Sequence, residues 1–250
     1  MKIFTIDVGN SRTHCAVVEA GRVSEVSDTP TAEFCEAFDF SSPGLPVSWA
    51  SVVPSAAEKI RAKLDAAGVP HMNLSWKNSP MPLDMKNPEQ LGQDRIAVAV
   101  GALEFFAPPF IVADMGTAVT IDLVDKNGTY AGGVIAPGLH AFVDYLNEKT
   151  AQLPKINPQD ADFDMALGKN TVEAMLVGCV KGFCRLADGI IRDMENAYFG
   201  GKSAYEKTIF TGGSVNLLPQ KWIGGRTAEP NLANIGLAKA YELNLNKTQL

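Results

Sequence analysis

Short apolar runs along the chain predict two similar sets of strands. In the first set the runs cover residues 2–8 and 13–19, and Gly21-Arg22 is expected to close a hairpin after them. The second set repeats this order, with strands predicted over 110–114, 118–124 and 130–135 and a turn over 125–128. Each half of the chain is therefore expected to open with a β-meander. One further strand is predicted for each half, over 48–53 and 209–210.

Longer segments between these strands predict helices. They are expected over 55–67, 91–105, 139–148, 171–198 and 231–244. At the first of these, Ser55-x-x-Glu58 resembles a capping box, and Gly68 is a suitable terminator. Strand meanders alternating with helices predict an α/β architecture.

Glycine and proline mark two more features of the chain. In the long helix over 171–198, Gly178, Gly182 and Gly189 are expected to permit close packing. Residues 76–90 carry several prolines and predict an irregular loop. Because long loops in compact domains are often functional, this one is a candidate for a role at a binding site.

Composition places the chain among ordinary globular proteins. It has 250 residues, of which 46% are hydrophobic and 20% charged, so it is long enough for one large domain or two modest ones. The two similar halves favour two domains, predicted over 1–111 and 112–250. The formal net charge of -6 argues against nucleic acid as a partner, since nucleic acid requires a basic face.

Neither a membrane segment nor a disulfide framework is predicted. No apolar run approaches the roughly 20 residues that span a bilayer, and the first strand begins without a signal-peptide pattern, so a cytoplasmic protein is expected. The cysteines form no CxxC pair and are expected to be reduced thiols, mostly in the core; they are Cys15, Cys35, Cys179 and Cys184. Of the histidines, His71 is expected in a surface loop and His140 near a binding site.

Two turns of similar sequence carry the candidate chemistry. Asp7-Val8-Gly9-Asn10-Ser11 and Asp114-Met115-Gly116-Thr117-Ala118 each follow a predicted strand. An aspartate at a strand end supplies a carboxylate for a metal, and the glycine after it lets backbone N–H groups approach an anion closely. Each motif alone is also compatible with a purely structural turn. Together they suggest two turns that bind one polyphosphate.

A third glycine motif, Thr211-Gly212-Gly213-Ser214, completes a known order. The three segments follow one another as do the phosphate-1, phosphate-2 and adenosine segments of the actin and sugar-kinase superfamily, which the chain resembles. The resemblance implies two ribonuclease-H-like domains with the active site in the cleft between them.

Further motifs narrow the resemblance to the type III pantothenate kinases over nearly the full chain. These motifs are Ser51-Val52-Val53-Pro54, Leu91-Gly92-Gln93-Asp94-Arg95, the extension through Val119-Thr120 of the second turn, and Gly132-Gly133-Val134-Ile135-Ala136-Pro137-Gly138. The resemblance implies ATP-dependent phosphorylation of pantothenate, the first step toward coenzyme A. A catalytically silent relative with a regulatory role and a kinase for another small molecule remain alternatives, because fold alone does not establish activity.

The resemblance also assigns roles around the acceptor. Asp94 is expected to accept the hydroxyl proton, and Arg95 to hold the pantothenate carboxylate or a phosphate oxygen. Gly92 and Gln93 are expected to contact the substrate. An Asp-Arg pair that only caps a helix and forms a salt bridge is the alternative. Thr171 matches a threonine that binds pantothenate in relatives, and its alternative role is a helix N-cap.

Roles at the nucleotide follow in the same way. Asp7 is expected to orient magnesium through water, since that ion retains part of its hydration shell. Asp114 is expected to lie near a monovalent cation, potassium or ammonium. The residues expected to contact ATP or its phosphates are Gly9, Asn10, Ser11, His14, Gly116, Thr117, Thr211, Gly212 and Gly213. Thr117 and Thr120 are expected to line the monovalent-cation site near Asp114.

Two positions depart from the family pattern. Relatives commonly have lysine where this chain has His14, which carries a charge only when protonated; a neutral strand histidine is the alternative. In relatives a tyrosine often precedes the segment that corresponds to Gly92-Gln93-Asp94-Arg95, named here the acceptor motif. This chain has Met85-Lys86-Asn87-Pro88 before it. The resemblance further implies a homodimer, with the helix over 171–198 as a candidate dimer surface.

Overall fold

The computed structural model describes residues 1–40 and 44–248. The chain divides into two compact units, each treated separately below. Unit 1 consists of Met1–Ala107, Gly128–Ala131 and Asn231–Leu250, and unit 2 of Pro108–Asn127 and Gly132–Pro230.

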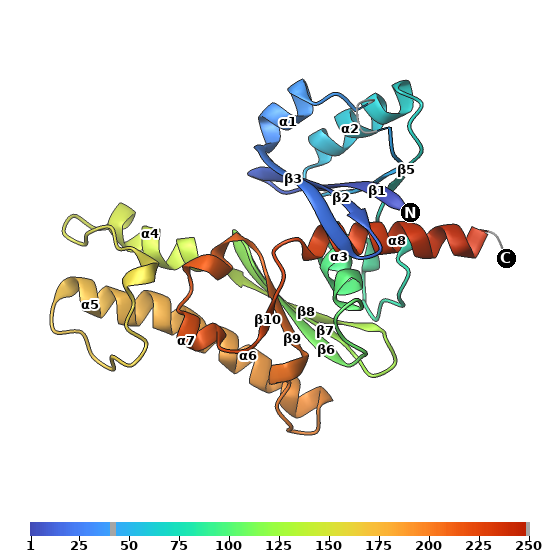
Figure 1. Ribbon diagram of the computed structural model, residues 1–250. Helices are drawn as coiled ribbons and strands as arrows, with labels where there is room; N and C mark the ends of the chain where they lie inside the picture. The colour runs from blue at the N-terminus through green and yellow to red at the C-terminus, as the bar shows by residue number, and fades with distance from the viewer. Residues whose placement is uncertain (41–43, 249–250) are drawn as a thin grey trace. The chain divides into compact units, whose positions relative to one another are not determined.

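Unit 1 is built on a five-stranded mixed sheet in the order β3-β2-β1-β4-β5 (Figure 1). Its strands are β1 (Lys2–Val8), β2 (Arg12–Glu19), β3 (Arg22–Pro30), β4 (Val47–Ser51) and β5 (His71–Asn73). The first three strands form the predicted antiparallel meander, whereas β4 pairs with β1 and β5 with β4 in parallel. The carboxyl ends of β1, β4 and β5 therefore lie along one edge of this sheet.

Helices cover both faces of this sheet. They are α1 (Thr31–Ala37), α2 (Pro54–Ala66), α3 (Gln93–Ala102) and α8 (Leu232–Thr248), with short 3₁₀ turns at Trp76–Asn78 and Pro88–Gln90. Figure 1 shows α1 and α2 together on one face. Alternate residues of β1 serve the two faces: Phe4 and Ile6 join a core with Leu64 of α2, and Ile3 packs with Tyr241 of α8.

Helices α3 and α8 approach each other through glycine. A Cβ at Gly101 would overlap the carbonyl oxygen of Leu232, and one at Gly236 would overlap the carbonyl of Ala97. Only glycine at both positions allows this backbone contact. The contact fixes the path of α3, which begins beside the acceptor motif.

Unit 2 contains a second five-stranded sheet in the order β10-β9-β6-β7-β8. Its strands are β6 (Phe110–Met115), β7 (Ala118–Val124), β8 (Tyr130–Pro137), β9 (Thr208–Thr211) and β10 (Thr227–Ala228). The first two residues of β8, Tyr130 and Ala131, are grouped with unit 1. Read from the opposite edge, the order is β8-β7-β6-β9-β10, so each strand corresponds to one of unit 1. In both sheets the strand carrying the Asp-x-Gly motif is central, antiparallel to the next strand and parallel to a later one. The predicted α/β class with a duplicated meander is confirmed.

The helices of unit 2 are α4 (Leu139–Lys149), α5 (Thr171–Met175), α6 (Gly182–Tyr198) and α7 (Gln220–Ile223). A π-helical segment, η4 (Leu176–Lys181), joins α5 to α6. Shorter 3₁₀ turns occupy Pro158–Asp160, Tyr205–Lys207 and Gly213–Leu217. The single long helix predicted over 171–198 is thus one continuous helical run whose middle turn is widened.

Several local predictions were wrong. At the start of α2, Val53 is the N-cap without a side-chain cap, and Pro54 occupies the first turn, so Ser55 forms no capping box. A Cβ at Gly178, Gly182 or Gly189 would meet nothing within 4 Å, so these glycines serve no close packing. His71 was expected in a surface loop but lies in β5. Its Nδ1 accepts a hydrogen bond from Trp49 Nε1.

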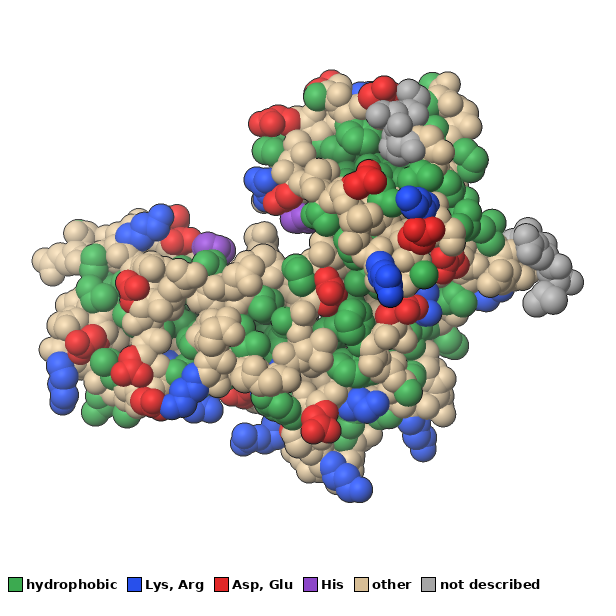
Figure 2. Space-filling view, in the orientation of Figure 1, with side chains coloured by type: hydrophobic (Ala, Val, Ile, Leu, Met, Phe, Trp, Pro, Cys, Tyr) green, Lys and Arg blue, Asp and Glu red, His purple; other side chains and the backbone are tan. Residues whose placement is uncertain are grey.

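The distribution of surface charge and the state of the cysteines can be compared with the sequence-based expectations. Acidic and basic side chains are interspersed on the face that Figure 2 shows, rather than gathered by sign. All four cysteines are buried and unpaired. Within residues 1–40 and 44–248, no helix combines the length and the apolar character needed to cross a bilayer.

Candidate functional site

The first phosphate motif lies at the carboxyl edge of the unit 1 sheet. Asp7 is the penultimate residue of β1, and its directly paired neighbours are His14 on β2 and Ala50 on β4. Directly paired residues point to the same face of a sheet, so Asp7 and His14 share a face. A half-buried carboxylate therefore stands at this edge, immediately before the glycine turn.

Hydrogen bonds within the protein fix Gly9 in the glycine turn, whereas the next two residues are exposed. The Gly9 N–H donates to the Arg12 carbonyl at 2.9 Å, and a Cβ at Gly9 would lie 3.0 Å from that oxygen. The Thr31 hydroxyl donates to the Gly9 carbonyl at 2.8 Å, while Asn10 and Ser11 are exposed. This arrangement leaves polar side chains at the front of the turn for an anion.

His14 sits in a row of charged groups. It is paired with Asp28 of β3 as well as with Asp7, and its Nδ1 lies 3.5 Å from Asp28 Oδ1. Arg12 contacts the same carboxylate at 2.6 Å. His14 is thus an exposed strand residue that shares Asp28 with a permanent cation.

The acceptor motif begins α3. Gly92 is the N-cap residue, and Asp94 lies in the first turn of the helix. The Asp94 carboxylate accepts the Arg95 N–H at 2.8 Å and lies against Gly92, where a Cβ would overlap its Oδ1. The glycine of this motif is explained by that approach.

Burial sets the protonation behaviour of Asp94. Removal from water raises the pKa of its carboxyl above the ordinary value, and the Arg95 N–H and charge oppose this only in part. The guanidinium carbon of Arg95 lies 6.0 Å from the ring centre of Tyr130, a residue of unit 1. A carboxyl with raised pKa beside a fixed cation suits proton acceptance.

Gln93 faces into the protein. Its Oε1 accepts hydrogen bonds from the Ser51 N–H at 2.8 Å and from Asn73 Nδ2 at 3.0 Å. Ser51 and Asn73 are the last residues of β4 and β5. The start of α3 is therefore attached to the strand ends beside Asp7. Nothing in the motif pattern pointed to Asn73, because the contact joins positions 20 residues apart.

The second phosphate motif occupies the equivalent edge in unit 2. Asp114 of β6 is directly paired with Thr120 of β7 and with Thr211 of β9. Gly212 has a φ of 90°, and a Cβ there would overlap Asp114 Oδ1 and the backbone of Met115. The second and third motifs thus meet at one carboxylate flanked by hydroxyls.

A helix start supports the loop of the second motif. Gly138 precedes α4 and donates its N–H to the Thr117 carbonyl at 3.1 Å. A Cβ at Gly138 would overlap the carbonyl oxygens of Gly116 and Thr117. The close approach explains the Pro137-Gly138 motif and places the N-terminus of α4, an anion-favouring feature, beside this loop.

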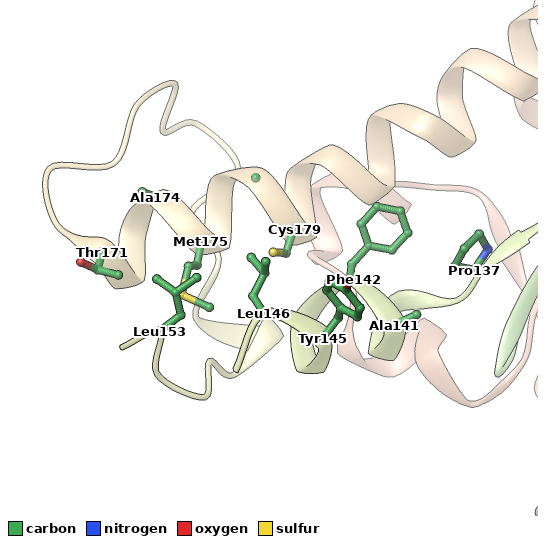
Figure 3. A pocket seen from close by; sticks show the side chains of 11 residues that line it. Pro137, Ala141, Phe142, Tyr145, Leu146, Leu153, Thr171, Ala174, Met175 and Cys179 are labelled. Carbon is green, nitrogen blue, oxygen red and sulfur yellow. The ribbon is translucent and has the colours of Figure 1, made fainter. Parts of the chain in front are cut away.

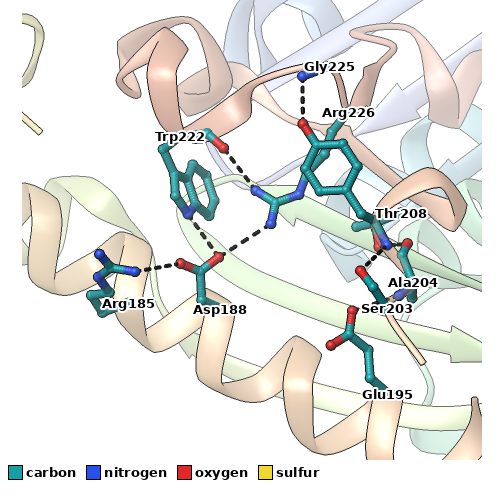
Figure 4. A network of polar contacts seen from close by, with 10 residues as sticks. Arg185, Asp188, Glu195, Ser203, Ala204, Thr208, Trp222, Gly225 and Arg226 are labelled. Carbon is teal, nitrogen blue, oxygen red and sulfur yellow. Dashed lines mark hydrogen bonds and ion pairs between the residues drawn. The ribbon is translucent and has the colours of Figure 1, made fainter. Parts of the chain in front are cut away.

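A polar and aromatic network holds the segment after the Gly212-Gly213 pair (Figure 4). Asp188 of α6 accepts a hydrogen bond from Trp222 Nε1 at 2.9 Å and lies 3.4 Å from Arg226 Nη2. The Arg226 guanidinium stacks within 4.8 Å of the Tyr205 ring centre and 5.4 Å of that of Phe210. Phe210 immediately precedes Thr211, so the network anchors the strand that carries the motif.

Thr171 lies in a different part of unit 2. The N-cap of α5 is Asn170, whose side chain accepts the Glu173 N–H at 2.9 Å, so the N-cap alternative for Thr171 was wrong. Thr171 instead lines an apolar groove of about 830 Å³ between α4 and the α5–η4 run. Figure 3 shows Thr171 at one end of this groove and Pro137 at the other, with Met175 and Tyr145 between them.

Oxygen donors dominate both strand edges. Carboxylates and hydroxyls suit hard cations such as magnesium or potassium, and magnesium needs few protein ligands when phosphates supply others. Across residues 1–40 and 44–248, no group of three or more His, Cys, Asp or Glu side chains forms a dedicated metal cluster. Asp7 and Asp114, each next to the last residue of a central strand, offer carboxylate oxygens of the kind that hold such cations.

Comparisons with known proteins identify the family of this chain. The family model described as type III pantothenate kinase matches residues 3–193. A type III pantothenate kinase of Streptomyces avermitilis is 41% identical over 67% of this chain and 62% of its own length. That of Streptomyces coelicolor is 32% identical over 98% of this chain and 99% of its own length. The chain thus spans less than two thirds of the first relative but nearly all of the second.

Two solved structures share the fold. A protein from Campylobacter jejuni described as a Baf family transcriptional activator has a TM-score of 0.69 and 20% identity, covering 97% of this chain and 99% of its own. A ROK family glucokinase from Streptomyces griseus, solved with glucose and AMPPNP, has a TM-score of 0.53 and 13% identity, covering 97% of this chain and 99% of its own.

The family match covers most of the chain and includes the turn after β1, the acceptor motif and the turn after β6. The chain belongs to the type III pantothenate kinase family.

Proposed function

We propose that this protein transfers the γ-phosphoryl group of ATP to the primary hydroxyl of pantothenate, giving 4'-phosphopantothenate at the start of coenzyme A synthesis. The observation that carries the proposal is the position of Asp94. Its carboxyl is buried at the start of α3, and Gln93 attaches that helix to the strand edge where Asp7 and the glycine turn lie. The family match and the names of the relatives supply the acceptor.

The acceptor motif divides the work at the hydroxyl. Asp94 accepts the proton from the hydroxyl as the hydroxyl oxygen attacks phosphorus. The rest of the site positions the reactants and neutralises charge, on which phosphoryl transfer mainly depends. Arg95 offers a planar fork to the pantothenate carboxylate or to a phosphate oxygen. Gly92 admits the Asp94 side chain, and Gln93 contributes backbone N–H from the helix start, since its amide oxygen is engaged within the protein.

The first turn binds phosphate. Gly9 lets the backbone approach an oxygen, and the exposed Asn10 and Ser11 donate hydrogen bonds. Asp7 would hold magnesium through water, and that ion would supply positive charge beside the phosphates. His14 adds a positive charge when protonated.

The second and third motifs complete the nucleotide contacts. Asp114 would hold a monovalent cation, potassium or ammonium, which would add positive charge beside the phosphates, and the Gly116–Thr117 loop contacts phosphate. The backbone of Thr211, Gly212 and Gly213 lies against the nucleotide. The close approach of Gly212 to the Asp114 carboxylate supports this arrangement, because it brings the second and third motifs together. It leaves no room for a larger residue at position 212.

The groove in unit 2 supports a homodimer. Its lining is apolar, and Tyr145 is 58% exposed although it belongs to that lining. Exposed aromatic side chains on an apolar groove are typical of protein interfaces. Thr171, at the end of the groove, binds pantothenate beside that interface.

Product analysis tests the proposal. The protein is incubated with ATP, magnesium and pantothenate in potassium, ammonium or sodium buffer, and products are identified by mass spectrometry. The expected result is equimolar ADP and 4'-phosphopantothenate in potassium or ammonium, with a much lower rate in sodium. Phosphorylation of a different alcohol in preference to pantothenate, or no transfer under any cation, would overturn it.

A further inference from the structure

The amide of Gln93 has a fixed orientation. Its one oxygen, Oε1, faces the Ser51 N–H, which can only donate a hydrogen bond. The oxygen assignment therefore follows from chemistry, and the group that Asn73 turns toward this oxygen must be its NH₂. The two amides are complementary in one arrangement only.

Asn73 is itself held on several sides. Its NH₂ also donates to the Trp49 carbonyl at 3.2 Å, and its backbone carbonyl accepts from Asn78 Nδ2 at 2.9 Å. Asn73 is directly paired with Trp49 at the end of β5. One side chain thus connects the ends of β4 and β5 to the first residue of α3.

This connection lies next to the proposed base. Asp94 follows Gln93 in the first turn of α3, and its carboxylate packs against Gly92 with no room to spare. A rotation or slide of this turn would move the carboxylate directly. Displacement of a catalytic group by about 1 Å can cost about 10²-fold in rate.

We propose that Asn73 is a positioning residue for Asp94, acting through Gln93 and the end of β4. The inference rests on the proposed function, since it gives Asn73 a role in proton acceptance by Asp94. Asn73 touches neither substrate in this account. Its effect is on the placement of Asp94, through the first residue of α3.

The test replaces Asn73 with leucine, which keeps the size and adds no charge. Asn73→Ser, whose shorter side chain does not reach Gln93, serves if the leucine variant fails to fold. The matched control is Asn78→Ala, which loses the Ser75 N–H bond at 2.7 Å and the bond to the Asn73 carbonyl but keeps the Asn73–Gln93 contact. Arg95, the charged group beside Asp94, is unchanged in all three variants.

The expected result is selective. In Asn73→Leu, kcat falls about tenfold or more while the KM for ATP changes less than twofold. The acid limb of its kcat profile moves to lower pH, because displacement of the first turn of α3 weakens the burial that raises the pKa of Asp94. Asn78→Ala loses thermal stability but keeps both kcat and the profile. A leucine or serine variant with wild-type kcat and an unmoved profile would overturn the proposal.

Two readouts are independent of turnover. Hydrogen exchange at the Ser51 N–H, and the titration of the Asp94 carboxyl followed by carbon-13 NMR, are measured without substrate. Both are expected to change in Asn73→Leu and to stay unchanged in Asn78→Ala. If wild-type protein fails to phosphorylate pantothenate while these changes appear, the proposed function fails and the placement of Asp94 by Asn73 stands; if neither readout changes, the positioning role fails.

Discussion

Gly212 lies directly against the carboxylate of Asp114, joining the turn after β9 to the motif at the end of β6. A Cβ at Gly212 would overlap Asp114 Oδ1, and the residue has a φ of 90°. Strain of this kind costs about 1–3 kcal/mol, and one kcal/mol corresponds to about 2–4 °C in Tm for a chain of this size. Glycine is thus required at this position by both space and backbone conformation.

Gly212→Ala is therefore expected to lower Tm by about 2–12 °C and to weaken binding of an ATP analogue. The control is Gly213→Ala, where a Cβ meets nothing within 4 Å and no positive φ applies. Its Tm is expected to stay close to that of the wild type. Differential scanning calorimetry and titration calorimetry measure the two effects; equal stability of both variants would contradict the crowding at Asp114.

The pH dependence of turnover follows from Asp94. The base must be ionised to accept a proton, and burial raises the pKa of this carboxyl. The kcat is thus maximal above the raised pKa and falls as pH falls through it. This acid limb is expected at a pH above the ordinary aspartate pKa of about 3.9. The measurement is kcat against pH at saturating substrates. An acid limb at or below the ordinary value would show that the reacting group is not this buried carboxyl.

The buried thiols are expected to react slowly. Burial raises the pKa of Cys15 and of Cys184 to about 12. At pH 8 the thiolate fraction of each is then on the order of 10⁻⁴, and the thiolate is the reactive form. Maleimide labelling of the folded protein, followed by peptide mass spectrometry, is expected to leave both unmodified until denaturant is added. Rapid labelling of either residue in the folded protein would contradict this packing.

The groove in unit 2 predicts a concentration-dependent dimer. Tyr145 is exposed and belongs to the groove lining, so a charge there should oppose association without damaging the core. Tyr145→Glu is expected to shift the protein toward monomer, and Tyr145→Phe to leave the dimer intact. Analytical ultracentrifugation over a range of concentrations gives the result. A wild-type protein that remains monomeric throughout would show that the groove has another role.

The fold could be predicted from sequence where patterns are local. The central strands β1 and β6 are continuous apolar runs, and the turns after them carry glycine at fixed offsets, so strand, turn and motif were recognised together. The short strands β5 and β10 were missed, because their few residues carry no clear period. Residues joined only by the fold, such as Asn73 with Gln93, give no signal in a single sequence.

Helix ends and the roles of glycines also divide into those that local sequence predicts and those that depend on contacts in the fold. Gly68 was recognised as a terminator, and its φ of 64° confirms the left-handed conformation that glycine favours. The expected capping box at Ser55 failed because Pro54 begins α2 one residue earlier and Val53 takes the N-cap position. Gly92 and Gly212 are required by close contacts, and their neighbours are known only from the structure.

Asp94 is the proposed base in the phosphorylation of pantothenate. In Asp94→Asn the amide cannot accept the proton, and positioned bases contribute about 10²–10⁴-fold to rate. Stability provides the control. Because the folded pKa lies above the unfolded one, ionised Asp94 lowers stability at neutral pH, so the asparagine variant is expected to have an equal or higher Tm.

The most direct measurement is the rate of 4'-phosphopantothenate formation by Asp94→Asn beside wild type, with binding of AMPPNP and magnesium measured on the same samples. The expected result is a kcat lower by about 10²-fold or more with a Kd for the analogue within about twofold of wild type. Formation of 4'-phosphopantothenate by Asp94→Asn at the wild-type rate would contradict the account.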